Sequence, residues 1–207
     1  MGATTNTRER IIEVAAALID EQGESAVRIR ELADTVGITQ PSLYHHFANR
    51  EAVLEAAHLH RFTTKQSFYV DAFLRDTAAC MSANDFQKVV SEFFDFAHSD
   101  ASRPIREARI TVMAGALRRP SLMKAVDESL QGMSSKMGEA FVIAQNNKWI
   151  REDLNISAFI YWLLGELTVL VFAESTGHAD LRPAISQLLR TSVFVNLGFS
   201  LDSDIAK

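Results

Sequence analysis

The sequence contains little that would support a disulfide-stapled or turn-rich fold. Its 207 residues include one cysteine, Cys80, so no disulfide can form within the chain. A lone cysteine is typical of proteins from reducing compartments. Only four prolines and nine glycines are present. This scarcity of turn-forming residues favours helices over an all-β fold.

Positive charge is scarce as well. The 21 Lys and Arg residues are outnumbered by 26 Asp and Glu residues, which gives a formal net charge of −5. Because nucleic-acid-binding domains usually carry a basic surface, this balance argues against a nucleic-acid partner. The segment from Thr35 to Arg50 is a local exception, because it contains no Asp or Glu, and Arg28 and Arg30 precede it. The charge pattern therefore allows a small DNA-facing surface of low nonspecific affinity.

Long uncharged apolar runs are also missing. The longest apolar stretch, from Ile156 to Ala173, contains Gly165 and Glu166. A carboxylate at the centre of a bilayer is costly, so a buried helix is favoured over a membrane span. The first ten residues are polar and lack the apolar core of a signal peptide. We therefore expect a soluble, cytoplasmic protein with no membrane partner.

Apolar residues recur at helical spacing along most of the chain, and strand signals are weak. Four helices are predicted in the first 60 residues: 6–22, 29–36 and two more that begin after Thr39 and Asn49. Asn6 and Glu9 have the spacing of a capping box, and Gly23 and Gly37 are expected to end the first two helices. Longer helices are predicted at 62–80, 84–98, 103–118, 121–146, 155–175 and 180–198. The predicted fold class is all-α.

The segment from Ile29 to Arg50 has the length and turn of a helix-turn-helix unit, in which the second helix enters the major groove of DNA. Leu43 and Phe47, four residues apart, would anchor that helix inward. The residues left on or near its outward face can bond to base edges or phosphates: Gln40, Pro41, Ser42, Tyr44 and His45. The alternative is a helical hairpin with a solvated polar face. Such a face would usually carry Lys and Glu, so the Tyr-His-His run favours DNA binding.

The stretch from Gly23 to Leu54 resembles the DNA-binding domain of TetR-type transcriptional regulators. The resemblance is carried by the string LYHHF at 43–47, by Arg50 three residues later, and by residues 30–33 and 36–38 of the preceding helix and turn. It implies an N-terminal three-helix DNA-binding domain at 1–61, with a linking helix from about residue 49. It also implies a larger helical domain at 62–207 for effector binding and dimerisation.

The resemblance assigns roles within the first domain. Tyr44 and Arg50 would hold the DNA backbone, and Arg30 stands where some members read a base. Gln40, Pro41, Ser42 and His45 would face bases, and Thr39 would begin the recognition helix beside them. Two positions depart from the family pattern. Arg28 replaces the usual Thr, so it can contact phosphate but cannot cap a helix, and Arg50 replaces the commoner Lys.

Two predicted helices of the second domain, 155–175 and 180–198, are apolar on more than one face. Helices of this kind are buried by their own domain or by a partner. As in the family, we expect two copies of each to form a four-helix homodimer interface; a purely internal core is the alternative. The predicted interface residues are Phe159, Trp162, Leu163, Leu189 and Phe194. Residues 149–154 resemble the family's connector before these helices, although Lys148 replaces a common glycine.

The effector pocket is harder to locate in the sequence. The candidates for a largely apolar cavity are Phe93, Phe94, Phe96, Arg109, Met113, Phe141 and Trp162. Each is also explained as ordinary core, because aromatic residues at helical spacing indicate packing before they indicate a pocket. Arg109 could hold an anionic group. A surface ion pair with Glu107 or Asp127 is the simpler expectation.

Catalytic and metal-binding motifs are not found. The sequence has no glycine-rich phosphate loop and no nucleophile elbow, and none of its six histidines forms an i, i+4 pair. His58 and His60 are expected to be solvated. We therefore predict no catalytic residue, no metal and no cofactor. The expected function is a ligand-responsive repressor, released from a palindromic double-stranded DNA operator by a small, largely apolar effector. An enzyme and a helical interaction module without DNA binding are the rival hypotheses.

Overall fold

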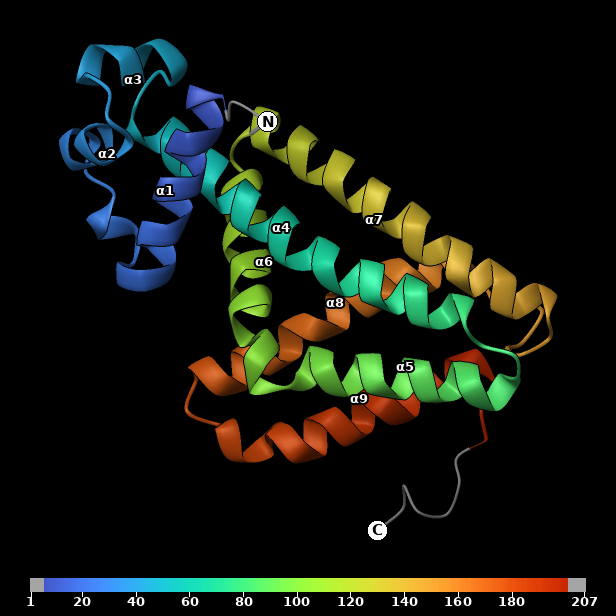
Figure 1. Cartoon of the computed structure of the whole chain (residues 1–207). Coiled ribbons are helices and arrows are strands. Elements are labelled where there is room, and N and C mark those ends of the chain that lie inside the picture. The colour runs from blue at the N-terminus through green and yellow to red at the C-terminus, as the bar shows by residue number, and fades with distance from the viewer. Residues whose placement is uncertain (1–5, 201–207) are drawn as a thin grey trace. The chain divides into compact units, whose positions relative to one another are not determined.

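The computed structural model describes residues 6–200, apart from the side chains of residues 65–68. These residues contain no strand and confirm the all-α prediction. The helices, drawn in Figure 1, are α1 (Thr7–Gln22), α2 (Ile29–Val36), α3 (Gln40–His46), α4 (Arg50–Ala78), α5 (Ala83–His98), α6 (Arg103–Ala116), α7 (Pro120–Asn146), α8 (Ile156–Ser175) and α9 (Arg182–Leu197). Three short 3-10 helices lie at Glu24–Ala26, Asp100–Ser102 and Ala179–Leu181.

Contacts divide the chain into two compact units. The N-terminal unit runs to Lys65 and includes Thr111–Val126, and the C-terminal unit comprises Gln66–Ile110 and the chain from Asp127 onward. Helices α4, α6 and α7 each contribute residues to both units. The domain boundary expected after residue 61 falls within α4. The expectation that a new helix begins near residue 62 is wrong, because α4 contains no glycine or proline that would end it.

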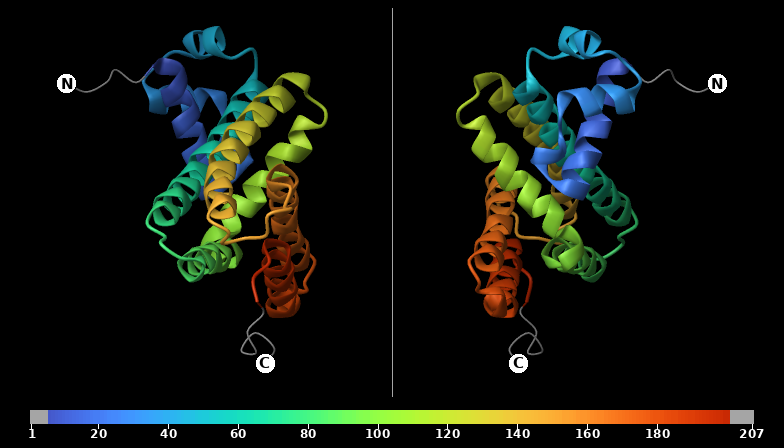
Figure 2. Two further views of the ribbon diagram at one scale, coloured as in Figure 1. Left: turned by 90° about the vertical axis from the view of Figure 1, so that its right-hand side faces the viewer. Right: turned by 90° about the vertical axis from the view of Figure 1, so that its left-hand side faces the viewer.

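Local sequence signals produce the predicted helix ends in the N-terminal unit. Asn6 and Glu9 form the capping box of α1, and Asn49 accepts a hydrogen bond from the amide of Ala52 at the start of α4. Gly37 ends α2 at a φ of 78°, a left-handed conformation that costs glycine least. The helices α1 to α3, blue in Figures 1 and 2, share one apolar core with the start of α4, in which Leu32, Leu43 and Val53 are fully buried.

The C-terminal unit has a separate, aromatic core. The rings of Phe73, Phe86 and Phe159 surround that of Phe141, with centroid separations of 5.4–5.9 Å. The helices α8 and α9, orange to red in Figure 2, pack against each other and contribute Phe159 and Phe194 to the same core. Because both of these rings are buried within their own subunit, their assignment to a dimer interface is wrong.

Candidate DNA-recognition surface and ligand cavity

The helix α3 is held so that its polar residues face solvent. Thr39 caps it by accepting a hydrogen bond from the amide of Ser42 at 3.3 Å, and Pro41 lies in the first turn, where no amide donor is needed. Leu43 and Phe47 are buried in the core below. This register leaves Gln40, Pro41, Tyr44 and His45 exposed and Ser42 half-exposed, which is the face that the sequence predicts.

Two arginines near the start of the chain brace this unit. The guanidinium of Arg8 lies over the ring of Phe47 at 5.0 Å from its centroid. Arg10 donates from Nη2 to the carbonyl of Val36 at 3.3 Å, at the C-terminal end of α2. Both residues join α1 to the helix-turn-helix segment. Arg28 and Arg30, by contrast, are exposed at the start of α2, where Arg28 forms an ion pair with Glu31 at 3.0 Å.

Arg50 lies where α4 begins, and its guanidinium is turned towards the protein. Its Nε donates to the carbonyl of Val27 at 2.8 Å, and its Nη2 donates to the carbonyl of Glu24 at 2.6 Å. Its Nη1 lies 3.5 Å from Glu51. These contacts connect the start of α4 to the residues just before α2. The predicted phosphate contact of Arg50 therefore has to compete with three intramolecular contacts.

The turn between α6 and α7 also contacts the start of α4. Arg119 pairs through Nη2 with Glu51 at 3.3 Å and through Nε with Glu55 at 2.8 Å. Glu51 thus bridges Arg50 and Arg119. A chain of polar contacts inside the N-terminal unit therefore runs from the α6–α7 turn to the backbone before α2.

His58 differs from its prediction as a solvated residue. Its ring is buried, with Nε2 at 2.7 Å from Glu24 and Nδ1 at 3.2 Å from Arg61. Arg61 in turn forms an ion pair with Asp20 at 2.7 Å. Sequence periodicity missed this cluster because Asp20 and Glu24 lie more than 30 residues from their partners. The cluster ties α4 to the end of α1.

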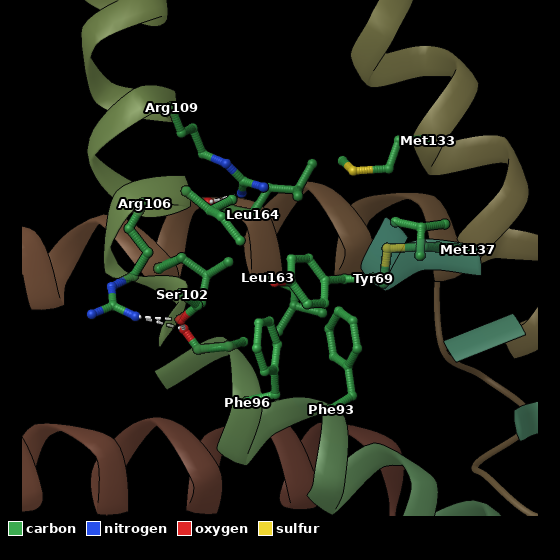
Figure 3. Close-up of a pocket in the computed structure, with 14 residues that line it drawn as sticks. Tyr69, Phe93, Phe96, Ser102, Arg106, Arg109, Met133, Met137, Leu163 and Leu164 are labelled. Carbon is green, nitrogen blue, oxygen red and sulfur yellow. Dashed lines mark hydrogen bonds between the residues drawn. The ribbon is translucent and has the colours of Figure 1, made fainter. Parts of the chain in front are cut away.

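An apolar cavity lies within the C-terminal unit. Its volume is about 60 Å³, and Figure 3 shows the side chains around it. Three predicted residues line it: Phe93, Phe96 and Arg109. An adjacent cavity of about 30 Å³ is lined by the predicted Phe93, Phe94 and Phe141. Met113 and Trp162 line neither of these two cavities.

The sequence did not predict several other residues of the larger cavity. They include Tyr69 from α4, Met133 and Met137 from α7, and Leu163 and Leu164 from α8. Helical periodicity placed these residues in a core, but a cavity arises only where several helices fail to fill the space between them. No spacing within one helix reveals that failure.

Arg109 is the charged residue of greatest interest in this cavity. It is only 7% exposed, so the expectation that it lies at the surface is wrong. Its Nη1 donates to the carbonyl of Leu164 at 3.0 Å. Burial lowers the pKa of Arg109 to about 10, which leaves it charged at neutral pH. Figure 3 shows Arg109 reaching from α6 towards Leu164, above the aromatic side chains.

A second arginine, Arg106, also lines the cavity and forms an ion pair with Glu174. Its Nη2 donates to Glu174 at 2.9 Å, and both side chains are buried. Its Nη1 donates to the hydroxyl of Ser102 at 2.6 Å, as Figure 3 shows. The charge of Arg106 is therefore balanced within the protein.

His98 borders the smaller cavity and contacts the ring of Phe94 in an edge-on arrangement, with 3.7 Å between ring centroids. Burial and the neighbouring Arg106, Arg190 and Arg182 lower the pKa of His98 to about 3. Its ring is therefore neutral at physiological pH, and its Nδ1 makes no hydrogen bond among the described residues. This effect could not be predicted from the sequence, because Arg182 and Arg190 lie more than 80 residues from His98 in the chain.

The outer faces of α8 and α9 carry apolar side chains that their own subunit does not cover. We call them the α8–α9 apolar face: Tyr161, Trp162, Val169, Phe172, Leu188 and Val195. Of the predicted interface residues, Trp162 belongs to this face, whereas Leu163 and Leu189 are half-buried against the core. Helix α8 is long and apolar enough to cross a membrane, and only 28% of its apolar window is buried. One such helix is weak evidence for a membrane span.

Comparison with known proteins matches the N-terminal unit to a family. The family model for bacterial regulatory proteins of the tetR family matches residues 11–57. The chain is 41% identical over 54 residues to the HTH-type transcriptional repressor KstR2 of Mycobacterium tuberculosis. The matched segment covers 26% of this chain and 27% of that protein. Over 49 residues it is 41% identical to the class C tetracycline repressor of Escherichia coli, covering 24% and 22% of the two chains. The match thus spans about a quarter of the length of these curated repressors.

Solved structures resemble the fold over nearly the whole chain. Salmonella enterica GusR aligns with a TM-score of 0.65 and 19% identity, covering 96% of this chain and 98% of that one. The regulator FadR from Bacillus subtilis, solved in complex with stearoyl-CoA, aligns with a TM-score of 0.53 and 20% identity, covering 87% and 96%. At these identities the likeness concerns the fold alone.

Proposed function

We propose that this chain is a regulator of the TetR family, that it represses transcription from operator DNA as a homodimer, and that a small molecule releases it. The exposed polar face of α3 carries the proposal. It combines groups that bond to base edges with a segment free of acidic residues. The matched part of KstR2 and of the tetracycline repressor, both repressors by name, supports the same role.

Residues of α3 and its surroundings divide into two groups in this proposal. Gln40, Pro41, Ser42 and His45 face base edges in the major groove. The DNA nearby is bound by Tyr44, Arg28 and Arg30. Tyr44 and Arg28 bind it through phosphates. Two such helices in a symmetric dimer would reach successive major grooves about 34–36 Å apart, so the operator is palindromic.

A selection from randomised duplex DNA tests base reading. We expect a two-fold symmetric sequence to be enriched by the unmodified protein. Gln40→Ala and His45→Ala should change which bases are enriched, because their bonds to base edges are lost. Gln22→Ala, an exposed glutamine at the end of α1, is the matched control and should enrich the original sequence. Equal loss of affinity for all sequences in Gln40→Ala and His45→Ala would exclude a reading role.

The α8–α9 apolar face supports dimerisation. Exposed apolar side chains on two adjacent helices are a common basis of subunit association. We propose that a second copy covers this face in the cytoplasm, in place of a membrane. Leu188→Glu should then produce monomers in sedimentation velocity experiments. Met81→Glu, at an exposed apolar residue between α4 and α5, should leave the dimer intact; equal dissociation of both variants would contradict the assignment.

Helix α6 supports a route from ligand to DNA. It carries Arg106 and Arg109 beside the cavity and continues into the N-terminal unit, where Arg119 follows its end. Through Glu51, Arg119 connects to the start of α4. An effector that favours a different position of α6 would act on this turn and so change the placement of α3. The effector must bind the two conformations unequally to have this effect.

The cavity supports an effector that is small and largely apolar. Aromatic and aliphatic side chains form most of its lining. The structurally similar FadR was solved with stearoyl-CoA, a ligand with a long apolar chain. If the protein binds a ligand but stays on its operator at every concentration of that ligand, the release mechanism is contradicted.

A further inference from the structure

We infer that the ligand of this protein is a neutral aromatic alcohol or phenol, and that its hydroxyl group forms a hydrogen bond with Nδ1 of His98 in the smaller cavity. This inference deepens the effector-responsive function proposed above and rests on it. It assigns the polar group of the ligand and the side chain that recognises it.

The burial of His98 is the first step of the argument. Among the described residues that line the smaller cavity, His98 alone has a side chain with a nitrogen or oxygen atom. The residue is 7% exposed, and its Nδ1 makes no hydrogen bond within the described part of the chain. A buried polar atom without a partner is costly, so a ligand group that bonds to Nδ1 would be favoured.

Contacts on two sides hold His98 in place. Its ring lies edge-on against that of Phe94, one helical turn earlier in α5. Its backbone carbonyl accepts a hydrogen bond from Nη2 of Arg182, the first residue of α9. A side chain that is already held loses little freedom when it binds a ligand. The position of Nδ1 is therefore largely set before the ligand arrives.

The charges around His98 favour a neutral polar group. Three arginines act on the ring, and each is paired with a carboxylate of the same unit: Arg106 with Glu174, Arg182 with Asp100, and Arg190 with Asp95. An anionic ligand would have to compete with these carboxylates. The ring of His98 is itself neutral at physiological pH. A hydroxyl both donates and accepts, so it can bond to Nδ1 in either neutral tautomer of the ring.

The remaining lining defines the body of the ligand. Aromatic rings from α4, α5, α7 and α8 line the smaller cavity, and they would pack well against an aromatic ligand. Phe93, Met137 and Leu163 line both this cavity and the larger one, where Figure 3 shows them. Methionine side chains adapt their shape readily. Movement of these three side chains would let a ligand extend from His98 into the larger cavity.

The position of His98 connects this contact to the proposed release. Helix α5 ends at His98, and α6 begins at Arg103. The carbonyl of Ala97 accepts a hydrogen bond from Nη1 of Arg106 on α6 at 2.8 Å. A ligand that bonds to His98 therefore acts beside the contact between the end of α5 and α6.

Calorimetric titration of the full-length protein, without DNA and near neutral pH, tests the inference with two matched probes. The molecules para-ethylphenol and para-ethyltoluene have the same shape, with a hydroxyl in the first where the second has a methyl. We expect para-ethylphenol to bind about tenfold more tightly, because para-ethyltoluene leaves Nδ1 without a partner. Failure of para-ethylphenol to bind, or an affinity no greater than that of para-ethyltoluene, would overturn the inference without any mutant.

Variants then locate the hydroxyl. His98→Leu removes Nδ1, so it should weaken para-ethylphenol about tenfold and leave para-ethyltoluene within about threefold. His98→Asn restores a donor and an acceptor close to the ring and should keep the preference for para-ethylphenol. His178→Leu, at an exposed histidine of the same unit, is the control and should bind both probes as the unmodified protein does. A preference for para-ethylphenol that persists in His98→Leu would place the hydroxyl elsewhere and overturn the assignment.

Nitrogen NMR of the unmodified protein, labelled at histidine, reports on the hydrogen bond directly. We expect para-ethylphenol to shift the Nδ1 resonance of His98 much more than para-ethyltoluene does. Equal shifts with the two probes would contradict the hydrogen bond. Tighter binding of para-ethylbenzoate than of para-ethylphenol, lost in His98→Leu, would overturn the assignment of a neutral ligand.

The outcome is independent of the proposed regulation, because these measurements contain no DNA. If para-ethylphenol binds through His98 but does not weaken operator binding, the ligand class stands and the release mechanism fails. If a molecule without a hydroxyl releases the operator and para-ethylphenol is not preferred over para-ethyltoluene, the release mechanism stands and the hydroxyl inference fails.

Discussion

Replacing Arg50 by methionine distinguishes a residue that positions the DNA-binding unit from one that contacts phosphate. The structure directs Nε and Nη2 of Arg50 to the carbonyls of Val27 and Glu24 at 2.8 and 2.6 Å. In favourable settings each hydrogen bond of a charged group contributes about 1.5–3 kcal/mol. The side chain is 39% exposed, so water competes, and we expect Arg50→Met to lower the free energy of unfolding by about 2 kcal/mol in total. The exposed contact with Glu51 adds little.

Urea denaturation and DNA binding as a function of salt measure the two roles separately. If Arg50 acts by positioning, Arg50→Met loses stability and binds all sequences more weakly, but the slope of log K against log salt is unchanged. If Arg50 contacts phosphate, as the family resemblance implies, the slope falls by about one because one fewer counterion is released. Arg28→Met is the comparison, since Arg28 is 71% exposed. It should reduce the slope by about one and change stability by less than about 0.5 kcal/mol. Unchanged stability with a reduced slope in Arg50→Met would refute the positioning role.

Four further predictions follow from particular groups. Lys148 has a φ of 59°, a left-handed conformation that is unfavourable for residues with a Cβ. Lys148→Gly should therefore stabilise the protein by about 0.5–1 kcal/mol, whereas Lys148→Ala should not. An equal gain in stability from both variants in urea denaturation would contradict this explanation. Burial raises the pKa of Glu166 to about 7, so its contribution to stability is present below its unfolded value near 4.5 and is lost as pH rises through 7. Glu166→Gln should therefore stabilise the protein more at pH 8 than at pH 5, and a constant difference would rule out this titration. Folding lowers the pKa of His98 from 6.5 to about 3. Between these two pH values the unfolded chain binds a proton at His98 and the folded protein does not. The free energy of unfolding therefore decreases as pH falls from 6.5 towards 3. His98→Gln should reduce that loss by at most about 1.4 kcal/mol per pH unit, measured by unfolding at pH 4 and 6. Finally, Arg119→Ala should retain DNA and ligand binding but reduce ligand-induced release about two- to fivefold, the size expected for a coupling of 0.5–1 kcal/mol; release unchanged in an anisotropy assay would exclude this route.

Local features of the fold were predictable because they depend on residues a few positions apart. The capping box of Asn6 and Glu9, the cap at Thr39 and the left-handed end at Gly37 all involve neighbours in sequence. The start of α5 and the bounds of α7 and α8 also agree with prediction to within a residue or so. The inward anchors Leu43 and Phe47 follow from the helical repeat alone.

Features that depend on distant residues could not be predicted in this way. Arg50 looks like a free surface cation in sequence, and only the fold brings it to carbonyls 23 and 26 residues away. Arg109 carries no sequence mark of its burial, because the surfaces that enclose it come from several helices. Phe159 and Trp162 are close in sequence, yet one belongs to the core and the other to the α8–α9 apolar face.

The small size of the cavities also determines how fast a ligand can enter. Spaces of about 60 and 30 Å³ hold a few water molecules at most, so a ligand of more than a few heavy atoms cannot occupy both until Phe93, Met137 and Leu163, which line both, move. Binding is then limited by how often these side chains move apart and not by how often ligand and protein collide. In a stopped-flow experiment the observed rate should level off as ligand concentration rises, at the opening rate of the side chains. A brief pulse of ligand, shorter than that opening time, would leave most molecules unoccupied.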